Sequence, residues 1–422
     1  MTPSDKKFGR AALNVYISLG TRETITNYSL LITNYLCPFS QGIRGALLIE
    51  VDVPFEFQDE DVLFAKISLP LLKSIFCVMI YFNSDYTAGA HAEVLDALVN
   101  TNLEHTVGYG LDGYTAEAKA LIRRAIGDDT AEVIFLVGGT QTNATAIDGI
   151  LARHEGVLAV ESGHIAVHES GAIEASGHKV LTLPEYCGKV RAEDVDSYIT
   201  EFYRDETYQH MVAPGMLYIS QPTEYGTIYS LRELEELSAV CHKHNIPLYI
   251  DGARMGYALM SEGADFSLRD IARLADVFYI GGTKCGALFG EALVVTNRTL
   301  LKNLFPLVKQ HGALLAKGRL LGLQFGVLFR DGLYERIAAK AVKLAIHLRE
   351  VVRKAGYEVV IESPTNQQFF RLPNVVIDTL REDISFDYWG PRGDESSVVR
   401  FVTSWATTHE DITQFEQLIN SL

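Results

Sequence analysis

Residues 246–259 read IPLYIDGARMGYAL, and residues 275–295 read ADVFYIGGTKCGALFGEALVV. Each stretch contains a short run of β-branched and aromatic residues bounded by Gly or Pro, which is typical of a central strand in a parallel sheet. The first strand would carry Asp251 and Arg254 at its carboxyl end, and the second would carry Lys284. Because open α/β sheets bind ligands beyond the carboxyl ends of their strands, we expect these side chains to line one site.

These three side chains suit one kind of chemistry. A lysine amine forms a Schiff base with an aldehyde, and a carboxylate keeps a pyridinium nitrogen protonated. The combination suggests an enzyme that uses pyridoxal phosphate. Taken singly, however, a lysine after a strand is usually a solvated loop residue, and Asp-Gly is a common turn.

Composition limits the classes of partner. The chain has 422 residues, 48% of them hydrophobic and 21% charged, as in an ordinary globular enzyme with a large core. A net charge of −16 argues against nucleic acid or a membrane surface as the main partner. The 5 cysteines are scattered and form no CxxC pair, so we expect no disulfide framework, no zinc site and a cytoplasmic location.

Strand-like and helical runs alternate along the middle of the chain, from about residue 132 to 295. This pattern predicts an α/β fold, with a mostly parallel sheet covered by helices on both faces. From residue 334 onward we expect a helix, the strands YEVVIES (357–363) and QQFFRLP (367–373), and a last amphipathic helix after Thr408. We therefore predict a large domain at 79–325 and a smaller α+β domain at 326–422.

Residues 1–78 differ from the rest of the chain, because they show no sustained period. Their most apolar part is interrupted by Lys66, Pro70 and Lys73, so it is too short for the roughly 18–20 residues that span a bilayer. The polar N-terminus also argues against a signal peptide. We expect an extension outside the catalytic fold, either loosely packed or translated ahead of a true start at Met79.

Two weaker patterns lie within the predicted large domain. The GGT turn at 138–140 follows a predicted strand and opens a helix, where backbone amides can hold an anion. It lacks the GxGxxG and GK[ST] spacings, so a plain strand-to-helix turn explains it equally well. His164, His168 and His178 show no HExxH spacing, and we expect no metal site there.

With these residues in view, the chain resembles the low-specificity L-threonine aldolases, which belong to the β-eliminating lyases among the aspartate-aminotransferase-like pyridoxal phosphate enzymes. The resemblance runs from Met79 to the C-terminus and is carried by MIYFNSD (79–85), HIAVHESG (164–171), DGAR (251–254) and GGTK (281–284). It implies a three-layer αβα large domain and a smaller C-terminal domain.

The resemblance also implies roles for individual residues. Lys284 matches the lysine that forms the Schiff base with the cofactor, and Asp251 matches the carboxylate that pairs with the pyridinium nitrogen. The remaining cofactor contacts would be Gly139 and Thr140 at the phosphate, His164 stacked on the ring, and Thr283 beside the lysine. The substrate carboxylate would be held by Ser84, Arg254 and Arg400, the last in VVRFVTSW (398–405), and Arg254 would also lie near the cofactor phenolate.

Three departures from the family pattern concern the reactive centre. Thr283 and Cys285 flank the lysine where Ser and Gly are usual. The loop SQPTEYGT (220–227) places Glu224 where many members carry a histidine, and HGALLAKG (311–318) lacks an arginine that Lys317 would have to replace. The base that removes the β-hydroxyl proton is therefore open between His164, Glu224 and a water molecule.

The resemblance implies retro-aldol cleavage of a β-hydroxy-α-amino acid, L-threonine or L-allo-threonine, to glycine and an aldehyde. It also implies a homodimer or homotetramer. The only other partner that it implies is the small amino-acid substrate. The alternatives are a β-eliminating lyase or another amino-acid enzyme on the same fold, a non-catalytic cofactor-binding homologue and, less favoured, a nucleotide-binding α/β protein.

Overall fold

The structure, a computed structural model, describes residues 14–18, 28–33, 47–51 and 79–422. The chain divides into two compact units, residues 1–74 and 75–422. In the first unit, β1 (Asn14–Ser18), β2 (Tyr28–Thr33) and β3 (Leu47–Val51) form an antiparallel sheet in that order. The sequence patterns did not predict these strands. We also expected residues 1–78 to lie outside the catalytic fold. Apart from these strands, that expectation falls on residues outside the described part of the chain.

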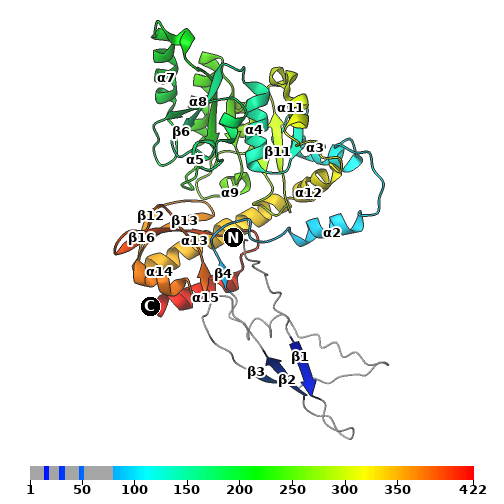
Figure 1. Ribbon diagram of the computed structural model, residues 1–422, viewed down its shortest axis with the longest axis vertical. Coiled ribbons are helices and arrows are strands. Elements are labelled where there is room, and N and C mark those ends of the chain that lie inside the picture. The colour runs from blue at the N-terminus through cyan, green and yellow to red at the C-terminus, as the bar shows by residue number, and fades with distance from the viewer. Residues whose placement is uncertain (1–13, 19–27, 34–46, 52–78) are drawn as a thin grey trace, which may run out of the picture. The chain divides into compact units, whose positions relative to one another are not determined.

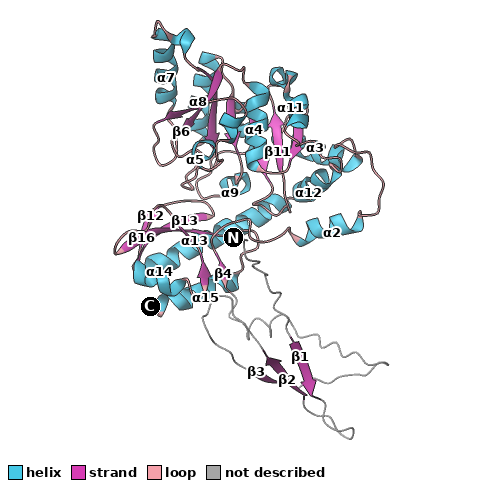
Figure 2. Cartoon of the chain, viewed as in Figure 1, coloured by secondary structure: helices cyan, strands magenta, loops and turns pink. Residues whose placement is uncertain are grey.

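The second unit is built on a sheet with the strand order β5-β11-β10-β9-β8-β6-β7 (Figures 1 and 2). β11 runs antiparallel to β5 and β10, and the other neighbours are parallel. The predicted, mostly parallel sheet is confirmed. The strands are β5 (Glu132–Leu136), β6 (Glu155–Val160), β7 (Val180–Leu183), β8 (Ala213–Ser220), β9 (Leu248–Asp251), β10 (Val277–Gly281) and β11 (Glu291–Val295).

Residues 275–295 differ from the prediction, because they form two strands rather than one. β10 ends at Gly281, and the chain reverses and returns as the antiparallel β11. Gly286 (φ 91°) and Gly290 (φ 114°) adopt left-handed backbone conformations that permit the reversal. The turn between the two strands carries Lys284.

The sheet is buried on both faces, and alternate side chains enter different cores. Phe278 and Ile280 of β10 join one core, whereas Val277 and Tyr279 join the other. Two-sided burial explains why these strands read as continuous apolar runs. The first core is covered by α2 (Ala92–Asn100), α3 (Gly113–Ile126), α7 (Ala192–Arg204), α8 (Leu231–His244), α9 (Met255–Leu259), α10 (Leu268–Leu274) and α12 (Arg319–Phe329). The second is covered by α4 (Gly139–Ile150), α5 (His164–Val167), α6 (Ala172–Ala175) and α11 (Leu304–Gln310).

Local signals set the ends of the longer helices. Asp112 begins α3 by accepting a hydrogen bond from the Thr115 amide at 2.8 Å, and Gly127 ends it in the left-handed conformation. Two short helical turns complete this unit: η1 (Tyr208–His210) precedes β8, and η2 (Arg298–Lys302) follows β11. No helix in the described part of the chain is long and apolar enough to cross a membrane.

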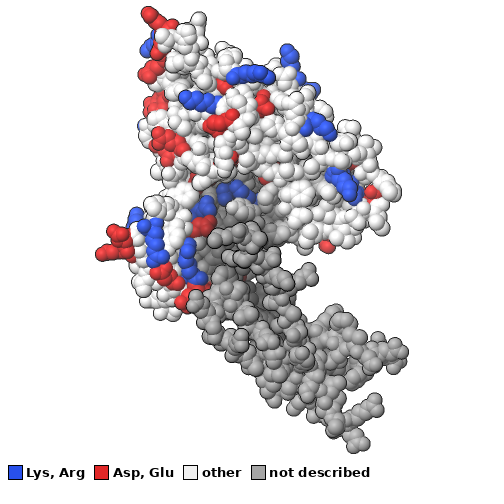
Figure 3. All heavy atoms as spheres, in the orientation of Figure 1, with Lys and Arg blue, Asp and Glu red and all other residues white. Residues whose placement is uncertain are grey.

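The C-terminal region has its own core. It comprises α13 (Leu333–Lys354), β12 (Glu358–Ile361), β13 (Gln367–Pro373), α14 (Asn374–Leu380), β14 (Ile384–Ser385), β15 (Asp387–Tyr388), β16 (Ser396–Val402) and α15 (His409–Asn420). Ile80 and Phe82 pack into this core, and β4 (Ile80–Tyr81) pairs with β14. Leu333 of α13 packs on the large sheet and Leu348 in the small core, so α13 links the two. The division at residue 325 stays a prediction. Acidic and basic side chains are interspersed on the face drawn in Figure 3.

Candidate active site

A pocket of about 240 Å³ lies at the carboxyl ends of the parallel strands. The segments that follow β5, β6, β9 and β10 all reach it, as the topology of an open α/β sheet requires. It is lined by Tyr86, Val137, Gly138, Gly139, Thr140, His164, Glu224, Asp251, Ala253, Tyr279, Thr283, Lys284 and Glu291. Seven of the predicted site residues therefore meet in one cavity: Gly139, Thr140, His164, Glu224, Asp251, Thr283 and Lys284.

Asp251 is a buried carboxylate at the end of β9. It accepts hydrogen bonds from the Tyr218 hydroxyl at 2.6 Å, the Asn143 amide at 3.1 Å and the Ala253 backbone at 2.9 Å. Burial raises the pKa of Asp251, but the charge on His164 and the Tyr218 hydrogen bond outweigh burial, and its pKa lies below the ordinary value. The side chain is thus an anion at neutral pH, held in one orientation.

His164 begins the short helix after β6 and faces the same pocket. Its Nδ1 lies 2.7 Å from Glu169, and Glu169 also accepts a hydrogen bond from Asn143 at 2.8 Å. Burial lowers the pKa of His164, but the Glu169 hydrogen bond and the charges of Glu224 and Asp251 raise it above the ordinary value overall. Sequence reasoning missed Asn143 and Glu169, although a polar residue such as Asn143 on the buried face of α4 was a visible signal.

The glycine turn leads directly into α4. Gly138 is its N-cap in an extended conformation, and a Cβ on Gly139 would meet the Tyr279 hydroxyl at 3.0 Å. A larger residue at 139 would therefore crowd the floor of the pocket. The turn places the first amides of a helix of 12 residues at the pocket, where they can hold an anion.

Lys284 lies in the turn between β10 and β11. The Tyr257 hydroxyl donates to the Lys284 carbonyl at 2.5 Å, which holds the backbone of the turn. Beside it, the Thr283 hydroxyl and the Gly282 amide donate to the buried Glu291 at 2.8 and 3.2 Å. Burial raises the pKa of Glu291 to about 8, against the lowering effects of Thr283 and Lys284. Glu291 was not among the predicted site residues, since an acidic residue at the start of an apolar strand gave no distinct signal.

The loop that carries Glu224 is held from both sides. The Tyr225 hydroxyl donates to Glu185 at 2.9 Å. The Gly226 carbonyl accepts hydrogen bonds from Ser363 at 3.0 Å and Thr365 at 3.2 Å, both in the C-terminal region. Glu224 therefore lines the pocket from an ordered loop.

Arg254 follows Ala253 but does not itself line the pocket. Its Nε donates to Asp85 at 2.7 Å and its Nη2 donates to the same carboxylate at 3.1 Å, in a buried bidentate ion pair. Sequence reasoning missed Asp85, whose neighbour Ser84 alone was singled out. The sequence around Arg254 gives no sign of this partner, because Asp85 lies 169 positions earlier in the chain.

The other two predicted substrate contacts lie outside the lining of the pocket. Ser84 is buried, and its hydroxyl has no hydrogen-bond partner among the described residues. Arg400, on β16, donates to Gln367 at 3.4 Å and to Asp387 at 3.2 Å, and its guanidinium lies over the Trp389 ring. Its Nε is also buried without a partner in the described part of the chain. Unpartnered buried donors of this kind are what a bound carboxylate would satisfy.

The residues present fit pyridoxal phosphate. A lysine amine suits its aldehyde, an ionised buried carboxylate suits its pyridinium nitrogen, and a helix N-terminus after a glycine turn suits its phosphate. The imidazole of His164 lies in the same cavity as all three.

Comparisons with known proteins agree with this fit. The beta-eliminating lyase family matches residues 82–373. A low specificity L-threonine aldolase from a Pseudomonas species is 30% identical over 331 residues, which is 77% of this chain and 93% of the relative. The corresponding Escherichia coli K12 enzyme is 24% identical over 356 residues, which is 80% of this chain and 97% of the relative.

Solved structures show the same relationship. The structure of a Leishmania major threonine aldolase superimposes with a TM-score of 0.79 at 42% identity, covering 81% of this chain and 99% of that one. An aspartate aminotransferase from Thermus thermophilus shares the fold, with a TM-score of 0.60 at 15% identity over 83% of this chain and 93% of that one. The aspartate-aminotransferase-like fold is therefore confirmed.

The pKa of Glu291 generates a prediction about pH. The folded chain holds the Glu291 proton up to about pH 8, whereas the unfolded chain releases it near the ordinary value of 4.5. Between these values the folded state binds more protons, so this group makes the free energy of unfolding fall as pH rises. A Glu291→Gln variant removes that dependence.

We expect Glu291→Gln, without cofactor, to gain stability over the wild type as pH rises from 4.5 to 8, by on the order of a few kcal/mol. Urea unfolding across this pH range measures the difference. Glu358→Gln, at a largely exposed position, is the control and should show no such trend. A constant difference between Glu291→Gln and the wild type over the whole range would contradict the prediction.

Proposed function

This chain belongs to the beta-eliminating lyase family, and from that membership we propose that it is a threonine aldolase-like carbon–carbon lyase. It cleaves a β-hydroxy-α-amino acid, L-threonine or L-allo-threonine, to glycine and an aldehyde. One observation supports this most directly: Lys284, Asp251 and the Gly139 turn line a single cavity.

The cofactor is pyridoxal phosphate. When bound, it supplies a protonated pyridine ring that takes up the electron pair of the breaking Cα–Cβ bond. Lys284 would hold its aldehyde carbon, and Asp251, which is ionised, would keep the ring nitrogen protonated. The amides of Gly139 and Thr140 would hold the phosphate, Thr283 would lie beside the lysine, and His164 would pack on the ring.

The substrate carboxylate would be held by Arg254, Arg400 and Ser84. The unpartnered Ser84 hydroxyl and Arg400 Nε support this role, because each is a buried donor available to an acceptor. Guanidinium groups suit planar carboxylates. Fixing the carboxylate also fixes the direction of the Cα–Cβ bond relative to the cofactor ring, which orients the bond for cleavage.

Glu224 is the better candidate for the base that removes the β-hydroxyl proton. The raised pKa of His164 means that this side chain keeps its proton to higher pH, and a protonated imidazole accepts no further proton. Glu224 lines the same cavity and is negatively charged when ionised. In this assignment, His164 packs on the cofactor and Glu224 moves the proton.

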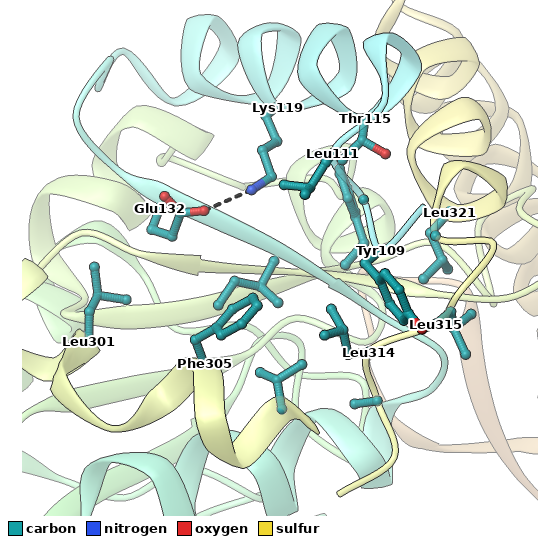
Figure 4. A pocket seen from close by; sticks show the side chains of 16 residues that line it. Tyr109, Leu111, Thr115, Lys119, Glu132, Leu301, Phe305, Leu314, Leu315 and Leu321 are labelled. Carbon is teal, nitrogen blue, oxygen red and sulfur yellow. Dashed lines mark hydrogen bonds and ion pairs between the residues drawn. The ribbon is translucent and has the colours of Figure 1, made fainter. Parts of the chain in front are cut away.

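We also propose that the enzyme is a homodimer or homotetramer. A second pocket of about 290 Å³ has an apolar lining that includes Tyr109, Leu111, Leu301, Phe305, Leu314 and Leu315 (Figure 4). Leu111 and Phe305 are 77% and 61% exposed. Apolar side chains that gather on a surface in this way mark interaction sites, and a second copy of this chain is the occupant we propose.

A cytoplasmic location is a proposal too. The Cys241 and Cys285 thiols are buried and free, which suits a reducing compartment. Fractionation of cells that produce the full chain would test it, and recovery in a secreted fraction would contradict it.

Product analysis tests the activity. The purified holoenzyme should convert L-threonine or L-allo-threonine to glycine and acetaldehyde, and Lys284→Ala should lose at least about 10³-fold in kcat, because the residue that holds the cofactor is gone. Loss of the visible absorbance band of the holoenzyme in Lys284→Ala reports the covalent link separately. Release of pyruvate and ammonia from L-serine, without glycine from threonine, would instead indicate a β-eliminating lyase.

Replacement of Glu224 tests the proton transfer. Glu224→Gln keeps the size and polarity of the side chain but removes the base, so we expect kcat to fall about 10²–10⁴-fold while the cofactor band is unchanged. His164→Asn serves as the comparison, and it should disturb the cofactor band as well as the rate. Full turnover by Glu224→Gln would remove Glu224 from this role.

Charge placed on the apolar pocket tests the oligomer. Leu111→Asp combined with Phe305→Asp should lower the molar mass measured by light scattering, because both side chains would be desolvated in the interface. Val375→Asp, on α14 at a position that is 72% exposed, is the control and should leave the mass unchanged. A wild-type monomer at micromolar concentration would refute the proposal.

A further inference from the structure

The ion pair between Asp85 and Arg254 is almost wholly removed from water. The two side chains are 0% and 9% exposed, and both carboxylate oxygens of Asp85 are engaged by the guanidinium. Breaking such a pair on one side is far more damaging than its net stability suggests, because the other charge stays buried. A pair of this kind holds the plane of the guanidinium in one direction.

Asp85 also joins three parts of the chain. It lies in the segment that follows β4, Arg254 follows the central strand β9, and Asn366 lies just before β13. The Asn366 amide donates to Asp85 at 3.0 Å and to the Thr403 carbonyl at 2.8 Å. The position of Arg254 is thereby tied to the C-terminal region, which also carries Arg400.

The pair lies at the edge of the active-site pocket. Tyr86, next to Asp85, and Ala253, next to Arg254, both line the cavity. Burial raises the pKa of Asp85, but the charges of Arg254 and Lys284 outweigh it, and the pKa lies below the ordinary value. Ser84 precedes Asp85 in the sequence, and its hydroxyl is buried without a partner among the described residues.

We propose that Asp85 is a positioning residue, which orients Arg254 so that the unused edge of its guanidinium meets the carboxylate of the amino-acid substrate. Asp85 engages Nε and one N–H of Nη2 and leaves the Nη1 side to another acceptor. Asp85 itself does not touch the substrate. The inference rests on the proposed function, in which Arg254 reads the substrate carboxylate.

A purely structural role would predict something different. If Asp85 only stabilised the fold, its replacement would weaken the binding of every ligand of the pocket alike. If it orients Arg254, replacement should weaken only ligands that carry a carboxylate. L-Serine and 2-aminoethanol provide the comparison, because they share the amine and the hydroxyl and differ by the carboxylate.

The experiment measures both dissociation constants by titrating the absorbance of the holoenzyme. For Asp85→Asn we expect the dissociation constant of L-serine to rise about 100-fold, because the guanidinium that binds its carboxylate is misplaced. The dissociation constant of 2-aminoethanol should change less than about threefold. Asp276→Asn is the matched control. Its carboxylate accepts from Leu248 and Asn297 at the opposite end of the same strands, so its loss should leave both constants unchanged.

Asp85→Glu covers the case in which Asp85→Asn does not fold, because it keeps the charge but displaces the guanidinium by one methylene. We expect it to weaken L-serine binding selectively. In an Arg254→Lys background, the substitution at Asp85 should add little further loss, since residues that act as a unit are not additive.

The outcomes separate the positioning role from the proposed function. Equal weakening of both ligands, or fully additive effects of the two substitutions, would overturn the positioning role and leave the proposed function standing. A wild-type enzyme that binds L-serine no better than 2-aminoethanol would overturn the recognition of the carboxylate itself, and with it the proposed function.

Discussion

The active site depends on one buried anion, the carboxylate of Asp251. A charge at the end of a central strand, covered by helices on both sides, is strongly disfavoured unless hydrogen bonds and opposite charge compensate for lost water. Tyr218, Asn143 and the Ala253 amide provide the hydrogen bonds. The nearby positive charge comes from His164, which pairs with the buried Glu169. A protonated pyridine ring would add positive charge beside this carboxylate.

The surroundings of this anion explain several features that otherwise look unrelated. Asn143 donates to both Asp251 and Glu169, so α4 is held at the end of β9 and at the segment that follows α5. The same helix begins at the glycine turn, whose amides we propose for the phosphate. The Tyr249 hydroxyl supports this arrangement by donating to Asn143 at 2.8 Å. These polar contacts would set the spacing between the groups proposed for the two ends of the cofactor.

The sequence predicted much of the fold, because its signals were local. The apolar runs of β9 and β10, the Gly127 helix end and the alternation of strands and helices each depend on neighbouring residues only. The seven pocket residues it identified follow glycine turns or strand ends, where the topology brings side chains together. By contrast, Asp85, Asn143, Glu169 and Glu291 were missed. The partners of Asp85 and Asn143 lie 169 and 108 positions away in the sequence. Glu169 and Glu291 lie only 5 and 8 positions from His164 and Thr283, but these spacings match no motif that would mark them.

By itself, the sequence determined which chemistry is available: a lysine, a carboxylate and a glycine turn, each at the end of a predicted strand. The hydrophobic pattern along the chain predicts the strands and helices, and therefore which side chains follow each strand. Only the tertiary structure decided which groups are charged, paired or left without a partner. Those properties depend on burial and on contacts such as Arg254 with Asp85, or Glu291 with Thr283, which arise when distant segments pack and exclude water. The tertiary structure therefore decided how Arg254 is held and which groups surround His164.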